Sequence, residues 1–295
     1  FPTRRSSDLQ LAGFALMMRA RQDDRRLFTR EIHLNIHALQ ETRDLDVTKL
    51  WQALNLNADW HKGEIQDLFA AKPAELDSND ARLQLLQDLA KSFEQAKTFG
   101  SLIDVPVEQA SELTKLAAVL MRLQNEGDAM QREAAQTLLP YVEQACLLAR
   151  RYDAVIANPP YMGGKGMNSD LKEFAKKQFP DSKSDLFAIF IERNLDLAKQ
   201  NGMVAMITMQ SWMFLSSFEA LRNRILNQHT ILSMAHLGAR AFDSIGGEVV
   251  STTAFVLENT HKPDYRGAYL RLVDGSSEAE KMEMMAKAIA QGRAA

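Results

Sequence analysis

The stretch Tyr152-Asp-Ala-Val-Ile-Ala-Asn-Pro-Pro-Tyr161 decides how this chain folds. Its apolar run with β-branched members predicts a buried strand. Two prolines then end the strand, because proline fixes its own φ and has no N–H to donate. Each proline keeps the residue before it out of the helical region, so Asn158 and Pro159 should be extended and stiff. The stretch therefore predicts a polar amide at the carboxyl end of a strand, where open α/β sheets bind their ligands.

This arrangement suits the transfer of a group to an amino or amide nitrogen. Such a nitrogen is a poor nucleophile because its lone pair is delocalised. The side-chain oxygen of Asn158 and the carbonyl of Pro159 would accept its N–H groups and favour the charge that develops on attack. Pro160 stiffens the turn, and Tyr161 would stack on the flat group that carries the nitrogen. A plain proline-rich turn is the alternative, and the apolar run before it argues against that alternative.

The composition places the chain among globular proteins and gives no overall case for nucleic acid. Hydrophobic residues make up 46% and charged residues 25% of the 295 residues, which are ordinary values. The net charge is −3, although residues 151–295 hold 17 Lys and Arg against 16 Asp and Glu. The single Cys146 excludes an internal disulfide framework and fits a cytoplasmic protein. No apolar stretch is long enough to span a bilayer and no His/Cys spacing suggests zinc, so neither a membrane nor a metal is expected.

Downstream of Tyr161, apolar runs alternate with helical periodicity. Strands are predicted for residues 203–208, 231–237 and 251–257, and helices for residues 184–200 and 217–226. Ser184 is the expected N-cap of the first helix, and Asn201-Gly202 its end. This alternation predicts an α/β fold with a mainly parallel, doubly wound sheet.

The chain before the key stretch is predicted to be mostly helical. Helices are expected over residues 10–30, 45–56, 81–99, 111–122 and 129–150, with Ser78 or Asp80 as a cap of the third. The piece Phe99-Gly-Ser-Leu-Ile-Asp104 is the exception, and it could form a strand that brings Asp104 to a cofactor, although a turn is the simpler interpretation. Trp51 and Trp60 could form an aromatic platform, but helix packing is the better hypothesis.

Two further segments could contact a substrate. Met162-Gly-Gly-Lys-Gly-Met-Asn168 is glycine-rich, so it could be a mobile loop with Lys165 near a phosphate, or an ordinary loop. Trp212 lies in the loop expected after the second strand, at the same edge of the sheet as Asn158.

The Asn-Pro-Pro-Tyr stretch resembles the catalytic motif of amino-methyltransferases that use S-adenosylmethionine. The helix that opens with Asp185-Leu-Phe187 and the strand Gly202-Met-Val-Ala-Met-Ile-Thr208 resemble later motifs of the adenine-N6 enzymes among them. The run from Leu237 to Leu257 and the long helical insertion resemble the PglX-type methyltransferases of BREX phage-exclusion systems. The resemblance covers about residues 10–275.

The resemblance implies a Rossmann-like class I methyltransferase sheet, N-terminally truncated, with a large helical insertion. It implies transfer of methyl from S-adenosylmethionine to a flipped adenine, with double-stranded DNA and other phage-defence proteins as partners. It also implies an aromatic residue opposite Tyr161, for which Phe242 is the candidate, although Phe242 could equally be a core residue. A glutamine or ribosomal-RNA amino-methyltransferase and a non-catalytic member of a defence complex are the alternatives.

The resemblance also predicts the division of the chain. Residues 1–9 are interpreted as a non-native scar, 10–30 as a helix of the methyltransferase domain and 31–148 as the insertion. Residues 149–275 would be the catalytic part, and 276–295 the start of a truncated C-terminal region. The glycine-rich turn and the acidic residue that hold the cofactor in this family were not found in the sequence, which predicts a truncated front.

Overall fold

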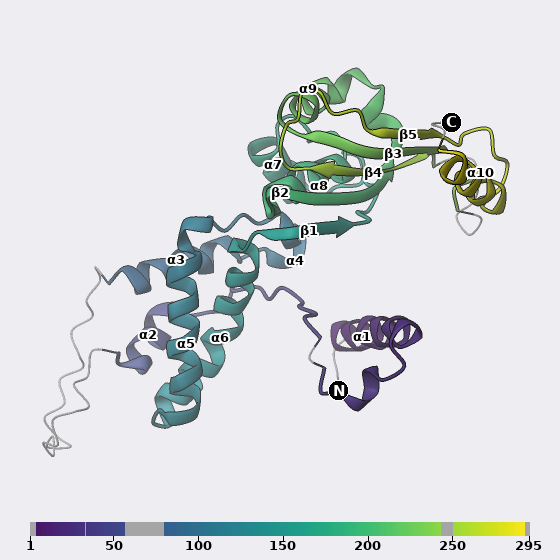
Figure 1. Cartoon of the computed structure of the whole chain (residues 1–295). Helices are drawn as coiled ribbons and strands as arrows, with labels where there is room; N and C mark the ends of the chain where they lie inside the picture. Colours follow the sequence, from purple (N-terminus) through teal and green to yellow (C-terminus); the bar gives the residue numbers. More distant parts are fainter. Residues whose placement is uncertain (1–3, 33, 57–79, 243–249, 293–295) are drawn as a thin grey trace, which may run out of the picture. The chain divides into compact units, whose positions relative to one another are not determined.

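The computed structural model describes residues 4–32, 34–56, 80–242 and 250–292. The chain divides into two compact units, residues 1–149 and residues 150–295 (Figure 1). We call them the helical unit and the sheet unit, and each is described by itself.

The helical unit contains only helices and turns among its described residues. Its α-helices are α1 (Arg4–Asp23), α2 (Val47–Leu54), α3 (Ala81–Ser92), α4 (Ala96–Phe99), α5 (Ala110–Glu126) and α6 (Ala129–Ala149). Short 3₁₀ turns lie at Leu27–Thr29, Gly100–Leu102 and Val107–Gln109. Leucines at three- and four-residue spacing supply the core, as the periodicity predicts; Leu83, Leu113, Leu120 and Leu138 are fully buried. Cys146 is half-buried against this core.

Helix α1 confirms the helix that was expected over residues 10–30 but differs in its bounds. It begins at Arg4, inside the segment that was set apart as a scar, and ends at Asp23. Its apolar stripe is exposed rather than packed: Leu11, Phe14 and Met18 are 67%, 63% and 46% exposed.

The strand proposed for residues 99–104 is wrong. The segment forms the end of α4 and the 3₁₀ turn Gly100–Leu102, in which Gly100 adopts a φ of +56°. Leu102 and Ile103 are buried, whereas Asp104 is exposed at the surface of the helical unit. The apolar residues thus anchor a connection between helices, and the strand that would have brought Asp104 to a cofactor does not exist.

Trp51 packs inside the helical unit, as the simpler hypothesis held. Its indole is 6% exposed, and the guanidinium of Arg82 lies 5.3 Å from the centre of its ring. Trp60 and the proposed cap Ser78 lie outside the described residues.

Asp80 is the N-cap of α3, and its removal gives the first testable prediction. Its carboxylate accepts from the backbone N–H of Arg82 at 2.8 Å and from the Arg82 guanidinium at 3.0 and 2.6 Å. Asp80→Ala should therefore lower the free energy of unfolding by about 1 kcal/mol, whereas Asp80→Asn, which keeps an acceptor, should cost less. Chemical denaturation of the 295-residue chain measures both. The control Asp88→Ala removes an exposed carboxylate of the same helix, and an equal loss there would refute the cap's role.

The contribution of Asp80 to the free energy of unfolding should also depend on pH. The hydrogen bond from the Arg82 side chain lowers the pKa of Asp80 below its usual value. The stabilisation is then complete above the ordinary aspartate pKa of about 3.9 and declines as the pH falls through the lower folded-state value.

The sheet unit is a five-stranded mixed sheet with helices, which confirms the α/β class. Its strands are β1 (Tyr152–Ala157), β2 (Ala198–Met209), β3 (Thr230–Gly238), β4 (Thr252–Glu258) and β5 (Ala268–Arg271), in the order β1-β2-β4-β3-β5. Its helices are α7 (Ser169–Gln178), α8 (Leu186–Leu197), α9 (Glu219–Gln228) and α10 (Glu278–Gln291), and 3₁₀ turns lie at Gln210–Met213 and Ser216–Phe218.

All four strands predicted from the sequence exist, and β1, β2, β3 and β5 run in one direction, as expected for a mainly parallel sheet, with β4 as the exception. β1 and β2 are parallel, as are β3 and β5, whereas β4 inserts antiparallel between β2 and β3. An apolar run shows that a strand is buried but not which way it runs, so the direction of β4 could not be predicted. β5 escaped prediction because it is four residues long and largely exposed.

Two helix bounds also differ from the prediction. Asp185, not Ser184, caps α8, because its carboxylate accepts from the N–H of Phe187. The helix ends at Leu197 rather than near Gln200, and β2 starts at once with Ala198. Asn201 takes a left-handed φ of +63° inside this strand, so Asn201-Gly202 marks an irregularity of β2 and not a helix end.

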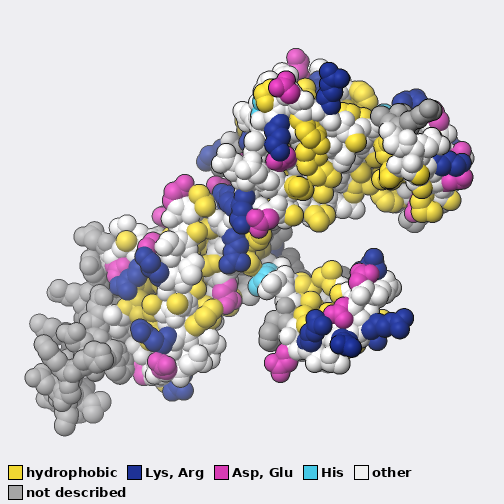
Figure 2. All heavy atoms as spheres, viewed as in Figure 1, with side chains coloured by type: hydrophobic (Ala, Val, Ile, Leu, Met, Phe, Trp, Pro, Cys, Tyr) yellow, Lys and Arg dark blue, Asp and Glu magenta, His cyan; other side chains and the backbone are white. Residues whose placement is uncertain are grey.

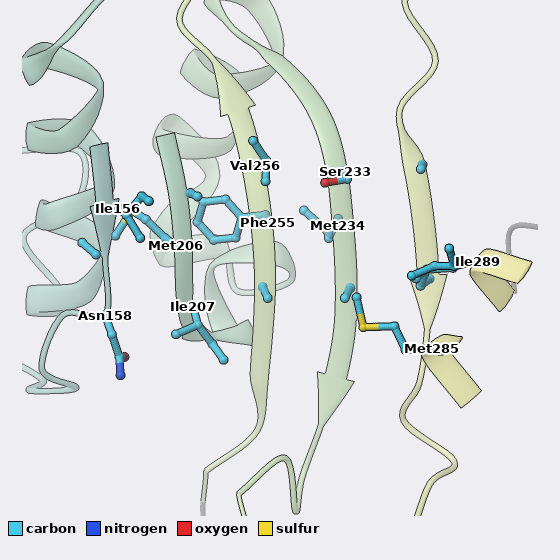
Figure 3. A pocket seen from close by; sticks show the side chains of 16 residues that line it. Ile156, Asn158, Met206, Ile207, Ser233, Met234, Phe255, Val256, Met285 and Ile289 are labelled. Atoms are coloured by element: carbon cyan, nitrogen blue, oxygen red, sulfur yellow. The ribbon is translucent and has the colours of Figure 1, made fainter. Parts of the chain in front are cut away.

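Among the described residues of the sheet unit, helices α8 and α9 cover one face of the sheet. Phe187, Ile191, Leu221 and Ile225 of α8 and α9 pack on it against Val204, Met206, Phe255 and Leu257. The opposite face is an open apolar surface (Figure 2), hollowed into a groove of about 600 Å³ that crosses all five strands and reaches Met285 and Ile289 of α10 (Figure 3).

The first strand is less buried than predicted. Val155 is half-buried toward α8, but Ile156 on the open face is 82% exposed. β1 is an edge strand, and β2 is its one partner among the described residues. Some of its apolar side chains are therefore left uncovered.

Candidate active site at the carboxyl edge of the sheet

Three strands deliver their following residues to the same edge of the sheet. β1 runs parallel to β2, and β2 and β3 both run antiparallel to β4, so β1, β2 and β3 share one direction. Met209 and Gly238 at the ends of β2 and β3 flank Thr252 at the start of β4. The residues after Ala157, Met209 and Gly238 therefore lie along one carboxyl edge, where α/β sheets bind ligands.

Asn158 begins the site directly after β1. Its side chain is exposed at the end of the open groove (Figure 3), while Pro159 behind it is buried and Pro160 is exposed. In the described part of the chain, no hydrogen bond engages the Asn158 amide. An exposed acceptor on a backbone stiffened by two prolines can receive an N–H group with little reorganisation, and the role of Asn158 as that acceptor stays a prediction.

Tyr161 is held against the core by an aromatic neighbour. Its half-buried ring meets the ring of Phe187 edge-on, with centroids 6.3 Å apart and planes at 89°. Phe187 is fully buried and packs in turn on Phe218, 5.7 Å away. Burial raises the pKa of the Tyr161 hydroxyl above its ordinary value of 10.0, so the phenol is neutral at physiological pH. A neutral, supported ring with a partly open surface can stack on a flat heterocycle.

The glycine-rich loop after Tyr161 is tied down in this structure. Gly163 bridges to Asp185, the Gly164 N–H donates to the Ser184 carbonyl at 3.2 Å, and the Gly166 N–H donates to the Gly163 carbonyl at 2.8 Å. None of the three glycines has a positive φ. A Cβ on Gly166 would approach Cγ of Met162 to 2.9 Å, so this position needs glycine for space.

Lys165 is exposed at the tip of the turn that Gly163 and Gly166 close. The exposed side chain can reach a phosphate group, and the proposed contact between Lys165 and a phosphate stays a prediction.

A polar pair lies beside the site, after β2. The Gln210 side chain meets His236 Nε2 of β3 at 2.6 Å, and the Gln210 N–H donates to the Ser251 carbonyl at 2.9 Å. The pKa of His236 is lowered, first by burial and then by Arg271 and Lys281, so its imidazole is favoured in the neutral form. These bonds join β2, β3 and β4 at the carboxyl edge and stiffen the loop next to Asn158.

Trp212, the predicted substrate contact of this loop, turns inward. Its indole is 3% exposed and packs on Phe255 at 5.2 Å between ring centroids, so it is a core residue in this structure. Phe214, two residues later, is 60% exposed and packs on the ring of His236 at 5.7 Å. The sequence pattern could not show which of the two aromatic side chains is buried. A 3₁₀ turn, and not a regular helix, determines which way each side chain points.

Two further predicted site residues, Phe242 and Asp104, remain to be placed. Phe242 is half-buried and follows β3, which is three strand spacings, or about 14 Å, from β1 along the edge. Residues 243–249, which follow Phe242, lie outside the described residues, and the pairing of Phe242 with Tyr161 stays a prediction. Asp104 belongs to the helical unit, and without the expected strand nothing in the structure supports it as a cofactor contact.

The residues at this edge have the chemistry needed to bind the acceptor of a methyl group, meaning an amino group on a flat ring. The Asn158 side chain and the Pro159 carbonyl are groups that can accept hydrogen bonds, and the half-buried Tyr161 ring keeps part of its surface open. Within the ranges that the structure describes, we find no cluster of three or more His, Cys, Asp or Glu side chains that could hold a metal ion. Among the described helices, none combines the length and apolar character needed to cross a bilayer.

Comparison with known proteins identifies close relatives. The model of the Eco57I restriction-modification methylase family matches residues 9–242. The chain is 52% identical, over 94% of its length, to the adenine-specific methyltransferase BrxX of Escherichia coli O9:H4 (strain HS). It is 36% identical, over 95% of its length, to the adenine-specific methyltransferase PglX of Lacticaseibacillus casei (strain Zhang). It spans 23% and 22% of the lengths of these two relatives.

Solved structures show weaker likeness. One is a putative class I S-adenosylmethionine-dependent methyltransferase from Listeria monocytogenes, with a TM-score of 0.35 and 15% identity over 70% of this chain and 76% of that chain. Another is the Type ISP restriction-modification enzyme LlaGI in complex with a DNA substrate mimic, with a TM-score of 0.39 and 15% identity over 57% of this chain and 18% of that chain.

Proposed function

Because this chain belongs to the Eco57I restriction-modification methylase family, we propose that the protein carrying it methylates adenine at N6 in duplex DNA. The single observation that carries the proposal is the placement of Asn158 to Tyr161: an exposed amide on a proline-stiffened turn, followed by a supported ring, at the carboxyl edge of the sheet. The adenine specificity in the names of both relatives supports this choice of substrate.

The chemistry assigns one task to each site residue. N6 of adenine is inaccessible in the duplex, so the target base must leave the stack. Tyr161 stacks on the extruded base, and the Asn158 side chain and Pro159 carbonyl accept its two amino hydrogens. These contacts raise the electron density on N6 and hold it in line for attack. S-adenosylmethionine, when bound, would supply the methyl group from its sulfonium and leave as the neutral thioether, and N6 would lose one proton to solvent.

The proposed biological role is the marking of host DNA in defence against phage. The matched family is one of restriction-modification methylases, and this name supports a role in distinguishing self DNA. Double-stranded DNA is the partner that the chemistry requires. Phe214 is an exposed aromatic candidate for contact with that DNA beside Asn158, and other phage-defence proteins are proposed as further partners.

The test is methylation of DNA by the full-length protein. We expect that incubation with S-adenosylmethionine and unmethylated duplex DNA yields N6-methyladenine, detected by mass spectrometry of the digested nucleosides. A catalytically impaired Asn158→Ala protein serves as the control for contaminating methyltransferases.

Two other results would replace the proposal. Methylated glutamine on a protein, or a methylated base in ribosomal RNA, with unmodified DNA would assign the site to another amino-methyltransferase. Absence of transfer to any of these acceptors, with S-adenosylmethionine bound, would favour a non-catalytic component of a defence complex.

A further inference from the structure

We infer that Asp185 is a positioning residue that fixes Tyr161 from the start of α8. The inference rests on the proposed function, because the ring that it places is the one assigned to stack on the target base. Asp185 lies 23 residues beyond Met162 in the sequence, and yet its side chain binds the backbone directly after Tyr161.

Met162 is held from both sides of its backbone. Its N–H donates to Oδ1 of Asp185 at 3.1 Å, and its carbonyl accepts from the N–H of Leu186 at 3.0 Å. The next residue, Gly163, forms an antiparallel bridge with Asp185, and the Gly164 N–H donates to the Ser184 carbonyl. The N–H of the peptide that joins Tyr161 to Met162 is thus bound to Asp185, and the chain from Met162 to Gly164 is bound to Ser184, Asp185 and Leu186 at the start of α8.

The same helix start also supports the ring. Phe187, two residues after Asp185, meets Tyr161 edge-on, and its own position is set by burial against Phe218. The Phe187 N–H donates to the same carboxylate oxygen, at 3.3 Å, that accepts from Met162. Oδ1 of Asp185 is therefore bound both to the backbone directly after Tyr161 and to Phe187, the residue whose ring packs on Tyr161. The triplet Asp185-Leu186-Phe187 acts as a single support.

The surroundings of Asp185 fit this role. The side chain is half-buried, and burial raises the pKa of its carboxyl group. Hydrogen bonds from the backbone N–H groups of Phe187, Met162 and Leu186 act in the opposite direction and lower this pKa. A Cβ on Gly163 would lie 3.4 Å from the second carboxylate oxygen, so the loop packs closely over the acid. The carboxylate keeps these amides paired where they are partly shielded from water.

An ordinary N-cap is the competing explanation, and the chain provides a matched control for it. Asn168 caps α7 in the same connection, and its Oδ1 accepts from the Leu171 N–H at 2.8 Å. This side-chain hydrogen bond of Asn168 joins two residues at the start of α7. Asn168→Ala thus removes an N-cap of comparable value without touching the support of Tyr161.

The first arm of the experiment measures amide hydrogen exchange of the Met162 N–H in full-length protein and needs no catalysis. We expect Asp185→Ala to speed exchange on the order of 10-fold, the equivalent of one lost hydrogen bond to a charged acceptor. Asp185→Asn keeps an acceptor oxygen and should restore most of the protection. Asn168→Ala should leave this amide unchanged. Equal exchange in Asp185→Ala and wild type would refute the support.

The second arm measures steady-state methyl transfer at a temperature where all variants are folded by circular dichroism. Asp185→Ala should lower kcat by about 10- to 100-fold with a smaller change in the KM for DNA, because misplacement of a reacting group by about 1 Å has effects of that size. Asp185→Asn should recover most of the loss. A kcat for Asp185→Ala equal to that of Asn168→Ala would reduce Asp185 to a plain N-cap. Inactive wild-type protein with the expected exchange pattern would refute the proposed function instead.

Discussion

Replacement of Asn158 by alanine in the full-length protein is expected to lower the turnover number for DNA methylation on the order of 10²–10³-fold. The exposed amide is the side-chain acceptor that directly follows β1, and its backbone is stiffened by two prolines. Removal of one preorganised hydrogen bond at a centre of developing charge has an effect of this size. The neighbouring carbonyl of Pro159 is unaffected, so residual transfer above background should remain. Tritium transfer from labelled S-adenosylmethionine to duplex DNA measures the loss.

A matched variant separates the chemistry from the fold. Asn227 is an exposed asparagine at the end of α9, just before β3 starts, and thus near the opposite edge of the sheet. Asn227→Ala should keep wild-type turnover, and both variants should keep the wild-type melting temperature, because an exposed amide carries little stability. Near wild-type turnover in Asn158→Ala would show that Asn158 does not accept the amino group.

Replacement of Tyr161 by alanine should have the second-largest effect. Stacking of a base on an aromatic side chain contributes about 1–3 kcal/mol, so the loss in kcat/KM should be about 5- to 150-fold. Duplex DNA with 2-aminopurine at the target position reports the extruded base by its fluorescence. This signal should fall in Tyr161→Ala, since the extruded base loses the surface on which it rests.

Tyr161→Phe is the control for this prediction. The hydroxyl is neutral at physiological pH, and the edge-on packing on Phe187 involves only the ring. The phenylalanine variant should therefore stay within about threefold of wild type, a change of under 1 kcal/mol. Equal losses in the alanine and phenylalanine variants would assign the role to the hydroxyl and refute stacking as the main contribution.

Local sequence patterns were enough to predict most elements of the sheet unit and the place of Asn158 after its first strand. Apolar runs with β-branched residues predicted β1 to β4, and three- and four-residue spacing predicted α8, α9 and most helices of the helical unit. Pro159 and Pro160 predicted a stiff turn that holds Asn158 at the carboxyl end of the strand. These features depend on residues close together in the chain, where propensity and backbone restriction act directly.

The way in which those elements combine became known from the folded chain. The antiparallel insertion of β4, the exposure of Ile156, the inward turn of Trp212 and the outward turn of Phe214 depend on which strands and helices become neighbours. The contact of Asp185 with Met162 joins residues separated by a loop and a helix, which no local pattern specifies. Hydrogen bonds and burial between distant segments are properties of the assembled sheet, and for that reason the support of Tyr161 became visible only in the folded chain.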